Sequence, residues 1–378
     1  MTDRMNQLIN YNLLILHDPS PEKLYQKGIT NKVVYKFEKI ANNFNKTILI
    51  CSKSKRKIHI KNVKTVYIHK YMKLFLSFYI LFYVLKYKIN IFRVYEPSFY
   101  ALAALPISKL LNVPMVTSLH GEWNKISKGY PKWMKIKGLI EPLIIKNSDY
   151  LTSTSHSLAS YAKRRGGKKV VEIPTWGCDT KIFKNNNKHK SNSLKINVIY
   201  IGRISPEKRL EYIIHTIYFL KKISKKKLKF YIIGPGDDTK NNYFNKIKDL
   251  CRAFNIEKFI LFTGGLNQKK LPSFYKKADC LLMTSITEGL PHPILEALSM
   301  NIPVVSSSVG DVKILIKNGR NGYKFNINTN PKTVAKLIIK AKNLKVKKEY
   351  GRNLILNGYS KESSVKKEIE IYNKMLSK

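Results

Sequence analysis

Short apolar runs alternate with longer segments of helical periodicity along almost the whole chain. The short runs are rich in β-branched residues, as strands are, and the longer segments place apolar residues at every third or fourth position, as helices do. This alternation predicts parallel sheets that are covered by helices on both faces. In the first half, the predicted strands are NLLILH, TILICS, TVYIHK, NIFRVY, PMVTSLH, DYLTSTS and VVEIP.

Residues 184–193, KNNNKHKSNS, interrupt this pattern. They contain no apolar side chain to bury, which is typical of a surface linker. The strand pattern then resumes with INVIYIGR, KFYIIG, FILFTG, CLLMTS, PVVSSS and GYKFN, and only helical periodicity remains from Pro331 onward.

A chain of 378 residues also exceeds what one hydrophobic core usually organises. We therefore predict two doubly wound, Rossmann-like α/β domains that face each other across a cleft, with helices at the C-terminus. The predicted boundaries are residues 1–185 for the first domain, 186–193 for the linker, 194–360 for the second domain, and 361–378 for a helix that packs back toward the first domain.

The chain is strongly basic, with 70 Lys and Arg against 24 Asp and Glu and a formal net charge of +46. Its richness in Lys, Asn, Ile and Tyr is explained equally well by codon bias and by selection for charge. The shortage of acids still gives a positive field that favours phosphates, anionic lipid surfaces or nucleic acid. Because the lysines are dispersed and no nucleic-acid motif is present, we expect no nucleic-acid partner.

The sequence contains four cysteines at wide spacings, without a CxxC pair. It therefore predicts neither a disulfide framework nor a zinc site. The apolar run at residues 12–17 is too short for a signal peptide. These features predict a cytoplasmic protein.

Residues 71–88, YMKLFLSFYILFYVLKYK, form an apolar predicted helix without charge between Lys73 and Lys86. These twelve residues would cover about 18 Å, which is short of the roughly 30 Å hydrocarbon layer of a membrane. The helix is therefore either buried in the core or lies at a membrane interface. Burial is favoured because helices of parallel α/β domains pack on a sheet.

Two glutamates bracket a proline-containing turn in TEGLPHPILEA, residues 287–297. Pro291 and Pro293 suit the first turn of a helix, and they leave the preceding amides pointing beyond the end of a strand, where anions bind. Glu288 and Glu296 offer carboxylates that accept hydrogen bonds from hydroxyls. For either glutamate alone, a favourable acid near a helix start is the simpler explanation. As a pair they indicate a ligand with sugar hydroxyls and phosphate.

A second loop with suitable chemistry is YIGRISPEKRLEYI, residues 200–213. Gly202 permits close approach of a ligand to the backbone. Arg203 and Lys208 lie after a predicted strand and could neutralise a diphosphate.

Four stretches, GRISPEK, TEGLPHPILEAL, IPTWGCDTKIF and FTGGLNQKKLPSFYKKADCLLMTS, together resemble the family-4 retaining glycosyltransferases of the GT-B fold, the glycosyl transferases group 1. The resemblance is close over residues 194–325. It is looser in the first half, where DYLTSTSHSLASYAKRRG carries it.

The resemblance implies that Glu288 contacts the donor sugar, that Glu296 contacts the ribose, and that Arg203 and Lys208 hold the diphosphate. It places His120, in TSLHGEWNK, near the transferred sugar. We take His120, Glu288, Arg203 and Lys208 as the catalytic candidates. The other candidates are Gly202, Gly264, Leu266, Gly289, Leu290 and Pro291 for the nucleotide sugar, and Gly121 and Trp123 for the acceptor.

The implied activity is transfer of a sugar from a nucleotide-sugar donor to a glycan or lipid-linked acceptor with retention of configuration. The departing phosphate would take the acceptor proton, and cationic side chains would stabilise its charge. No DxD sequence is present, so we expect neither a metal nor another cofactor. Aromatic residues mixed with lysines in GEWNKISKGYPKWMKIKG, residues 121–138, suit a sugar acceptor or an anionic membrane surface. They suggest a peripheral site at the cytoplasmic membrane face.

Several departures from the family pattern bear on this interpretation. A glycine-rich loop after the first strand is replaced by HDPSPEKLYQKGITNK, which has only Gly28. Relatives often have an acid where Ile314 stands and a glycine where Arg209 stands. The alternatives are an epimerase or phosphorylase of the same fold, and a basic nucleic-acid- or membrane-binding protein that uses this scaffold without transferase activity.

Overall fold

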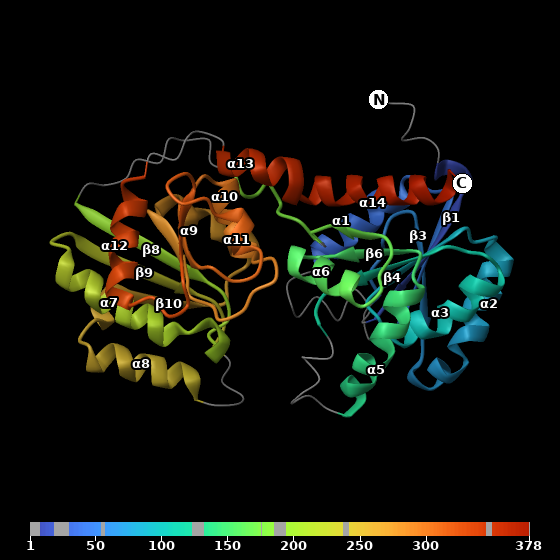
Figure 1. The fold of residues 1–378 in the computed structure, drawn as a ribbon, viewed down its shortest axis with the longest axis horizontal. Coiled ribbons are helices and arrows are strands. Elements are labelled where there is room, and N and C mark those ends of the chain that lie inside the picture. The colour runs from blue at the N-terminus through green and yellow to red at the C-terminus, as the bar shows by residue number, and fades with distance from the viewer. Residues whose placement is uncertain are drawn as a thin grey trace. The chain divides into compact units, whose positions relative to one another are not determined.

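The computed structural model describes residues 8–18, 30–53, 57–122, 132–174, 176–184, 194–236, 242–344 and 350–377. Contacts within the chain divide it into two units, which Figure 1 shows as ribbons. Unit 1 consists of Met1–Gly177 and Lys361–Lys378, and unit 2 is Cys178–Ser360. The predicted linker, residues 186–193, lies outside the described residues.

Unit 1 contains a parallel sheet that has seven strands over its described residues, in the order β3-β2-β1-β4-β5-β6-β7. The strands are β1 Asn12–His17, β2 Lys46–Ser52, β3 Val63–Ile68, β4 Ile91–Tyr95, β5 Met115–Leu119, β6 Tyr150–Ser153 and β7 Val170–Glu172. Each corresponds to a predicted apolar run. The strand order changes direction between β1 and β4, which is where open α/β sheets bind ligands.

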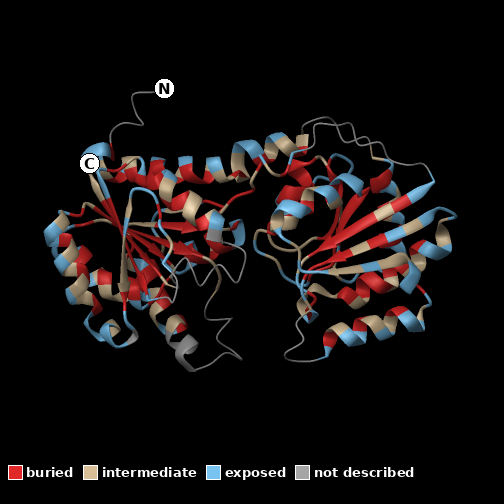
Figure 2. Ribbon diagram, turned by 180° about the vertical axis from the view of Figure 1, so that it is seen from behind, coloured by how far each residue is buried: buried red, intermediate tan, exposed pale blue. Residues whose placement is uncertain are grey.

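Helices cover both faces of this sheet. They are α1 Thr30–Ala41, α2 Leu76–Tyr87, α3 Phe99–Leu110, α5 Lys132–Asn147, α6 His156–Arg164 and α14 Lys361–Leu376, with a 3-10 helix at Lys70–Phe75 before α2. Alternate residues of β1 point to opposite faces: Leu13 and Ile15 pack with α1 and α14, whereas Leu14 and Leu16 pack with α2 and α3. Figure 2 shows the strands largely buried between their helices.

Unit 2 repeats this architecture with a parallel sheet that has six strands in the described range, in the order β10-β9-β8-β11-β12-β13. The strands are β8 Lys195–Ile201, β9 Lys227–Ile233, β10 Ile260–Gly264, β11 Cys280–Met283, β12 Val304–Ser307 and β13 Gly322–Phe325. The direction of strand order changes between β8 and β11. The prediction of two doubly wound parallel sheets is therefore confirmed.

Two cores flank the sheet of unit 2. One contains α7 Leu210–Ile223, α8 Tyr243–Ala253 and α12 Pro331–Lys342, and the other contains α9 Leu271–Lys277, α10 His292–Ser299 and α11 Val312–Leu315. A short 3-10 helix, η4 Pro206–Lys208, follows β8, and another, η6 Gln268–Lys270, precedes α9. Helix α13, Tyr350–Leu354, and a π-helical turn, Ile355–Tyr359, end the unit. The four cysteines are buried thiols outside any disulfide.

The apolar segment 71–88 is buried on one side only. Helix α2 packs Leu76, Ile80 and Val84 into the core of unit 1. Its opposite side is exposed and apolar, so the favoured prediction of burial describes half of the helix. No helix of the described residues is both long and apolar enough to cross a bilayer.

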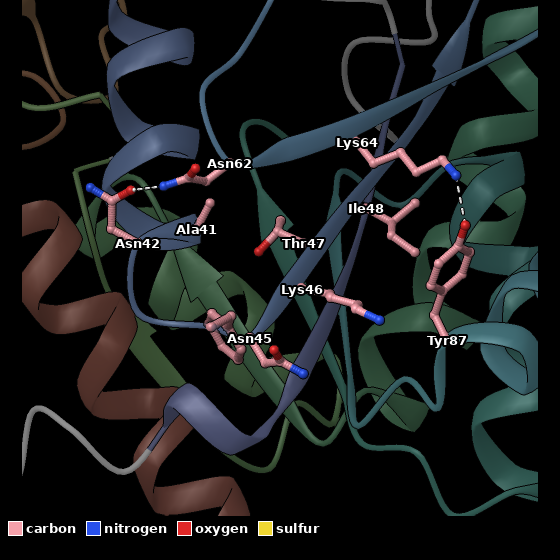
Figure 3. Close-up of a pocket in the computed structure, with 10 residues that line it drawn as sticks. Ala41, Asn42, Asn45, Lys46, Thr47, Ile48, Asn62, Lys64 and Tyr87 are labelled. Carbon is pink, nitrogen blue, oxygen red and sulfur yellow. Dashed lines mark hydrogen bonds between the residues drawn. The ribbon is translucent and has the colours of Figure 1, made fainter.

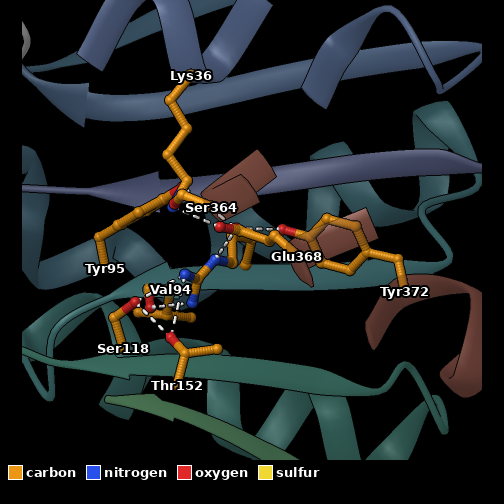
Figure 4. Close-up of polar contacts among 9 residues, drawn as sticks. Lys36, Val94, Tyr95, Ser118, Thr152, Ser364, Glu368 and Tyr372 are labelled. Carbon is orange, nitrogen blue, oxygen red and sulfur yellow. Dashed lines mark hydrogen bonds and ion pairs between the residues drawn. The ribbon is translucent and has the colours of Figure 1, made fainter. Parts of the chain in front are cut away.

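A buried ion-pair network fixes α14 to the sheet of unit 1 (Figure 4). Glu368 of α14 accepts a hydrogen bond from Arg93 Nε of β4 at 2.5 Å and pairs with Lys36 Nζ of α1 at 2.7 Å. Tyr372 Oη donates to the same carboxylate at 2.7 Å. The guanidinium of Arg93 also donates to Ser118 Oγ at 2.7 Å. A buried carboxylate is thus matched by two cations and by neutral donors.

Substitution of Glu368 by Gln should destabilise unit 1 by about 3–5 kcal/mol, because it leaves two buried cations without their counter-charge. Unfolding of unit 1 can be followed selectively, since the only tryptophans of the sequence are residues 123, 133 and 176. Urea unfolding monitored by tryptophan fluorescence is the measurement. Glu370→Gln, at an exposed position of the same helix, is the matched control and should change stability by less than about 0.5 kcal/mol. Equal effects of the two substitutions would contradict the role of the network.

The same carboxylate predicts a pH dependence. Burial alone would raise the pKa of Glu368, but Arg93 and Lys36 outweigh it and lower the pKa from 4.5 to about 2. A carboxyl with a depressed folded-state pKa stabilises the fold above its unfolded pKa and loses this contribution as the pH falls from 4.5 toward 2. The loss amounts to at most about 3 kcal/mol. Stability of the native chain should therefore fall more steeply over this range than that of Glu368→Gln.

Candidate functional site

Lys208 and Glu288 meet where the strand order of unit 2 changes direction. Lys208 ends η4 after β8, and Glu288 lies in the loop between β11 and α10. Lys208 Nζ lies 2.7 Å from Glu288 Oε1, and the two side chains are only 16% and 12% exposed. Ser285 Oγ donates to the same oxygen at 2.6 Å. Two residues predicted from separate motifs therefore form one polar pair at the carboxyl edge of the sheet.

Hydrogen bonds join the two loops that carry this pair. The amide of Ile286 donates to the carbonyl of Glu207 at 2.9 Å. The hydroxyl of Thr284 donates to the carbonyl of Lys208 at 2.8 Å. Because β8 and β11 are also neighbours in the sheet, Lys208 and Glu288 are positioned by both backbone and side-chain contacts.

The backbone of Gly310 packs directly against the loop that contains Glu288. Its φ is +49°, and a Cβ atom at this position would lie 1.9 Å from the carbonyl oxygen of Glu288. The next amide, of Asp311, donates to the carbonyl of Gly289 at 3.1 Å. Only glycine allows both the left-handed conformation and this close approach.

The start of α10 offers backbone donors beside the pair. Pro291 is the N-cap residue, and His292 begins the helix. In the part of the chain that the structure describes, the amides of Gly289 and Leu290 have no hydrogen-bond acceptor. Amides at a helix start, next to a lysine, suit an anion.

Arg203 extends from the loop after β8 and is well exposed. Its Nη2 lies 2.8 Å from Glu207 Oε1, and Ser205 Oγ donates to the same oxygen at 2.7 Å. Burial alone would raise the pKa of Glu207, but the Ser205 hydroxyl and Arg203 lower it below its usual range. The loop motif did not indicate Glu207 as an orienting partner of Arg203, although the spacing of four residues between them suits an ion pair. Gly202 lies beneath this loop, against Gly234 of the neighbouring strand end.

Glu296 is buried within α10, with an exposed fraction of 5%. Its Oε2 accepts a hydrogen bond from Tyr275 Oη at 3.1 Å, and Gln268 Nε2 lies 3.3 Å from Oε1. Burial, and then the charge of Glu296, raise the pKa of Tyr275 well above its usual value, so this phenol stays a donor. The sequence around Tyr275 gives no sign that it is a neighbour of this carboxylate.

Gly264 and Leu266 lie farther along the same sheet edge. Gly264 ends β10 with a φ of +67°, and its carbonyl accepts a hydrogen bond from the amide of Gly234 at 2.9 Å. Leu266 is half-buried against the core that contains α9 and α10. Strand β9 separates them from β8, so they are not in the immediate surroundings of Lys208.

The carboxyl edge of the unit 1 sheet places His120 directly after β5, with Gly121 next to it. Burial, and then the positive charges of Arg93, His17 and Lys36, lower the pKa of His120 to about 3. The imidazole is therefore neutral at pH 7. His17, at the end of β1, is a buried neighbour that sequence analysis missed because it ends an apolar run. Trp123 and the loop that contains Gly28 lie outside the described residues.

The two departures from the family pattern have different structural settings. Arg209 adopts left-handed backbone angles, φ 52° and ψ 55°, which glycine reaches without strain. Its guanidinium donates to the carbonyl of Ile327 at 2.7 Å and stacks on the ring of Tyr212 at 4.8 Å, contacts that offset the strain. Ile314 is a partly exposed residue of α11.

A pocket of about 430 Å³ lies at the opposite edge of the unit 1 sheet, at the amino ends of β2 and β3 (Figure 3). It was not predicted from the sequence. The lining residues are Ala41, Asn42, Phe44, Asn45, Lys46, Thr47, Ile48, Asn62, Lys64 and Tyr87.

The described residues contain no cluster of three or more His, Cys, Asp or Glu that could hold a metal ion. Metal independence stays a prediction.

Comparison with known proteins gives a consistent result. Residues 181–361 match the family of glycosyl transferases group 1. The sulfoquinovosyl transferase SQD2 of Arabidopsis thaliana is 25% identical over 262 residues, which are 64% of this chain and 48% of that protein. The UDP-Gal:alpha-D-GlcNAc-diphosphoundecaprenol alpha-1,3-galactosyltransferase of Escherichia coli is 27% identical over 55% of each chain. The chain thus spans about half the length of these relatives.

Solved structures share the fold. A glycosyltransferase from Rickettsia africae superposes with a TM-score of 0.73 at 18% identity, over 97% of this chain and 99% of that one. Anabaena HepE, in complex with UDP, has a TM-score of 0.73 at 13% identity, over 96% of this chain and all of its own.

Substitution of Gly310 by Ala should destabilise unit 2, since the new methyl group must displace the Glu288 loop in addition to adopting a left-handed conformation. Gly319→Ala is the matched control, because Gly319 has a φ of +74° and a Cβ atom there would meet no other atom within 4 Å. The control should cost about 1–2 kcal/mol for the backbone alone. Thermal unfolding by calorimetry should show a larger loss for Gly310→Ala. Equal losses of stability in the two variants would mean that the Glu288 loop can move to accommodate the methyl group, and would contradict the prediction.

Proposed function

We propose that this chain transfers a sugar from a nucleotide-sugar donor to a glycan or lipid-linked acceptor, with retention of configuration, because residues 181–361 match the glycosyl transferases group 1 family. The observation that carries the proposal is the Lys208–Glu288 pair, 2.7 Å apart, at the point where the strand order of the matched domain changes direction. Ligands of open α/β sheets bind at such points.

The donor diphosphate would lie between the cationic loop after β8 and the start of α10. Lys208 would exchange its contact with Glu288 for a phosphate oxygen, and Arg203 would provide a second cation. The amides of Gly289 and Leu290 add neutral donors at a helix start. Once Lys208 moves to the phosphate, the carboxylate of Glu288 is available to accept hydrogen bonds from the hydroxyls of the donor sugar.

In the proposed reaction, the bond between the anomeric carbon and the diphosphate oxygen breaks, and the acceptor oxygen bonds to the same face of that carbon. The acceptor proton passes to the departing phosphate oxygen, so no protein base is required. The products are the glycoside and a nucleoside diphosphate. Arg203 and Lys208 accelerate the step because they stabilise charge that grows on the leaving group. This chemistry needs no metal if the two cations suffice.

His120 would act through hydrogen bonds and not through charge. Its pKa of about 3 keeps the ring neutral, so that one nitrogen can donate and the other can accept. A neutral imidazole suits a sugar hydroxyl. We assign His120 to the transferred sugar.

One relative bears on the acceptor. The name of the Escherichia coli galactosyltransferase includes a diphosphoundecaprenol, which is a lipid-linked substrate. We extend the same class of acceptor to this chain, with a glycan acceptor as the other candidate. A lipid-linked acceptor would bring the protein to the cytoplasmic face of a membrane.

Binding of nucleoside diphosphates tests the donor site. Calorimetric titration with UDP, GDP and ADP should reveal one preferred nucleotide, and Lys208→Met and Arg203→Ala should each weaken its binding about tenfold or more, as expected for the loss of a charge-assisted hydrogen bond. Lys332→Met, at an exposed position of α12, is the control and should leave the dissociation constant unchanged. The preferred nucleotide should bind equally in EDTA.

Turnover tests the rest of the proposal. With the matching nucleotide sugar and a lipid-linked or glycan acceptor, the anomeric configuration of the product, measured by proton NMR, should equal that of the donor. An inverted product would refute the retaining mechanism. Absence of nucleotide binding, together with tight salt-sensitive binding of RNA or DNA, would replace the transferase with a nucleic-acid-binding function.

A further inference from the structure

The outer side of α2 and of the 3-10 helix before it is an exposed apolar surface. We call Leu74, Phe75, Phe78, Phe82 and Leu85 the apolar face. These five side chains are between 53% and 89% exposed. From Phe75 onward they recur every three or four residues, so they form one stripe along the helix. The buried residues Leu76, Ile80 and Val84 lie on the opposite side and already anchor the helix in the core.

Folding of unit 1 does not explain the apolar face. A helix that covers a sheet needs one apolar side, and its solvent side is ordinarily polar. Here the solvent side has three phenylalanines and no charge between Lys73 and Lys86. A contiguous exposed patch of this kind marks a surface that contacts another apolar phase or molecule.

Lysines border the carboxyl end of the apolar face. Lys86 Nζ lies 5.2 Å from the ring centre of Phe82 and 5.8 Å from that of Tyr87. Lys64 Nζ donates to Tyr87 Oη at 2.6 Å, and Lys46 Nζ lies 5.9 Å from the same ring. All three lysines are exposed. Aromatic rings and cations therefore form a continuous border from the apolar face to the pocket that Figure 3 shows.

The sequence of this region is basic, although the carboxylate of Asp18 pairs with Lys73, the residue before the apolar face, at 2.9 Å. The sequence contains no Asp or Glu between Glu38 and Glu96, a stretch that includes α2 and the strands β2 and β3. The chain as a whole does contain 24 acids. A basic border attracts anionic surfaces and repels cationic ones, and its attraction to anionic lipids is about 1 kcal/mol per lysine near the surface.

We propose that the apolar face inserts into the surface of an anionic phospholipid bilayer, with Lys46, Lys64 and Lys86 at the level of the lipid phosphates. The twelve residues of α2 extend over about 18 Å, which is too short to cross a bilayer. Because the apolar face runs along one side of the helix, the helix lies in the plane of the interface. The polar pocket beside Tyr87, with its amide and lysine side chains, accepts a phospholipid headgroup. This inference names the membrane-binding surface and does not depend on the transfer reaction.

Vesicle sedimentation tests the proposal. The native chain should bind vesicles of phosphatidylcholine mixed with phosphatidylglycerol much more tightly than vesicles of phosphatidylcholine alone, and high salt should weaken the binding. Phe78→Ser combined with Phe82→Ser should lower the partition coefficient about tenfold or more. The control combines Leu261→Ser with Ile314→Ser, which are exposed apolar residues of unit 2 at 45% and 40%, and should leave binding unchanged.

Further variants separate the electrostatic from the apolar contribution to vesicle binding, and membrane binding from dimer formation. Neutralisation of Lys46, Lys64 and Lys86 by Gln should remove the preference for phosphatidylglycerol. Failure of the native chain to bind anionic vesicles, or equal binding by the serine variant, would overturn the proposal. So would a lipid-free dimer that the serine variant converts to a monomer in sedimentation equilibrium, since the face would then join two copies. Nucleotide binding by the serine variant should stay native, which separates this test from that of the donor site.

Discussion

The structure of unit 1 depends on placing a carboxylate in the middle of a hydrophobic core. Arg93 is 1% exposed in the central strand β4, and a guanidinium at that position is unstable without an opposite charge. Glu368 provides this charge from a helix that is 275 residues away in the sequence. Lys36 adds a second cation, and Tyr95 and Tyr372 surround the carboxylate with phenol groups. These contacts consequently hold α1 and α14 in fixed positions on the sheet.

The two sheets carry different side chains at the point where their strand order changes direction. In unit 2, loops from the adjacent strands β8 and β11 bring opposite charges together. The close backbone approach of Gly310 and the hydrogen bond from the Thr284 hydroxyl restrict the movement of these loops. In unit 1, the corresponding edge has aromatic and imidazole groups from β1, β4 and β5, including His17 and His120, close to Arg93. One edge thus brings a lysine and a carboxylate together and the other brings imidazole and aromatic rings together, although six strands of the unit 1 sheet follow the same order as the strands of unit 2.

Much of the fold could be predicted because strands of parallel sheets are buried on both faces and therefore form continuous apolar runs. Lys208 and Glu288 were identified because each belongs to a loop motif after such a run. Their direct contact could not be predicted, since it depends on side-chain directions that a motif does not specify. Arg93 was hidden within the strand NIFRVY, and Glu368 within a polar helix. Neither has local sequence features that indicate its partner.

The discontinuity of unit 1 has a consequence for synthesis of the chain on the ribosome. Residues of unit 2, Cys178–Ser360, are made before α14, so unit 2 can complete its sheet while unit 1 still lacks a helix. During that interval Arg93 has no carboxylate opposite it, and the apolar side of α1 has no α14 to cover it. Unit 1 can therefore complete its core only after α14 has been synthesised, whereas the core of unit 2 needs no later segment.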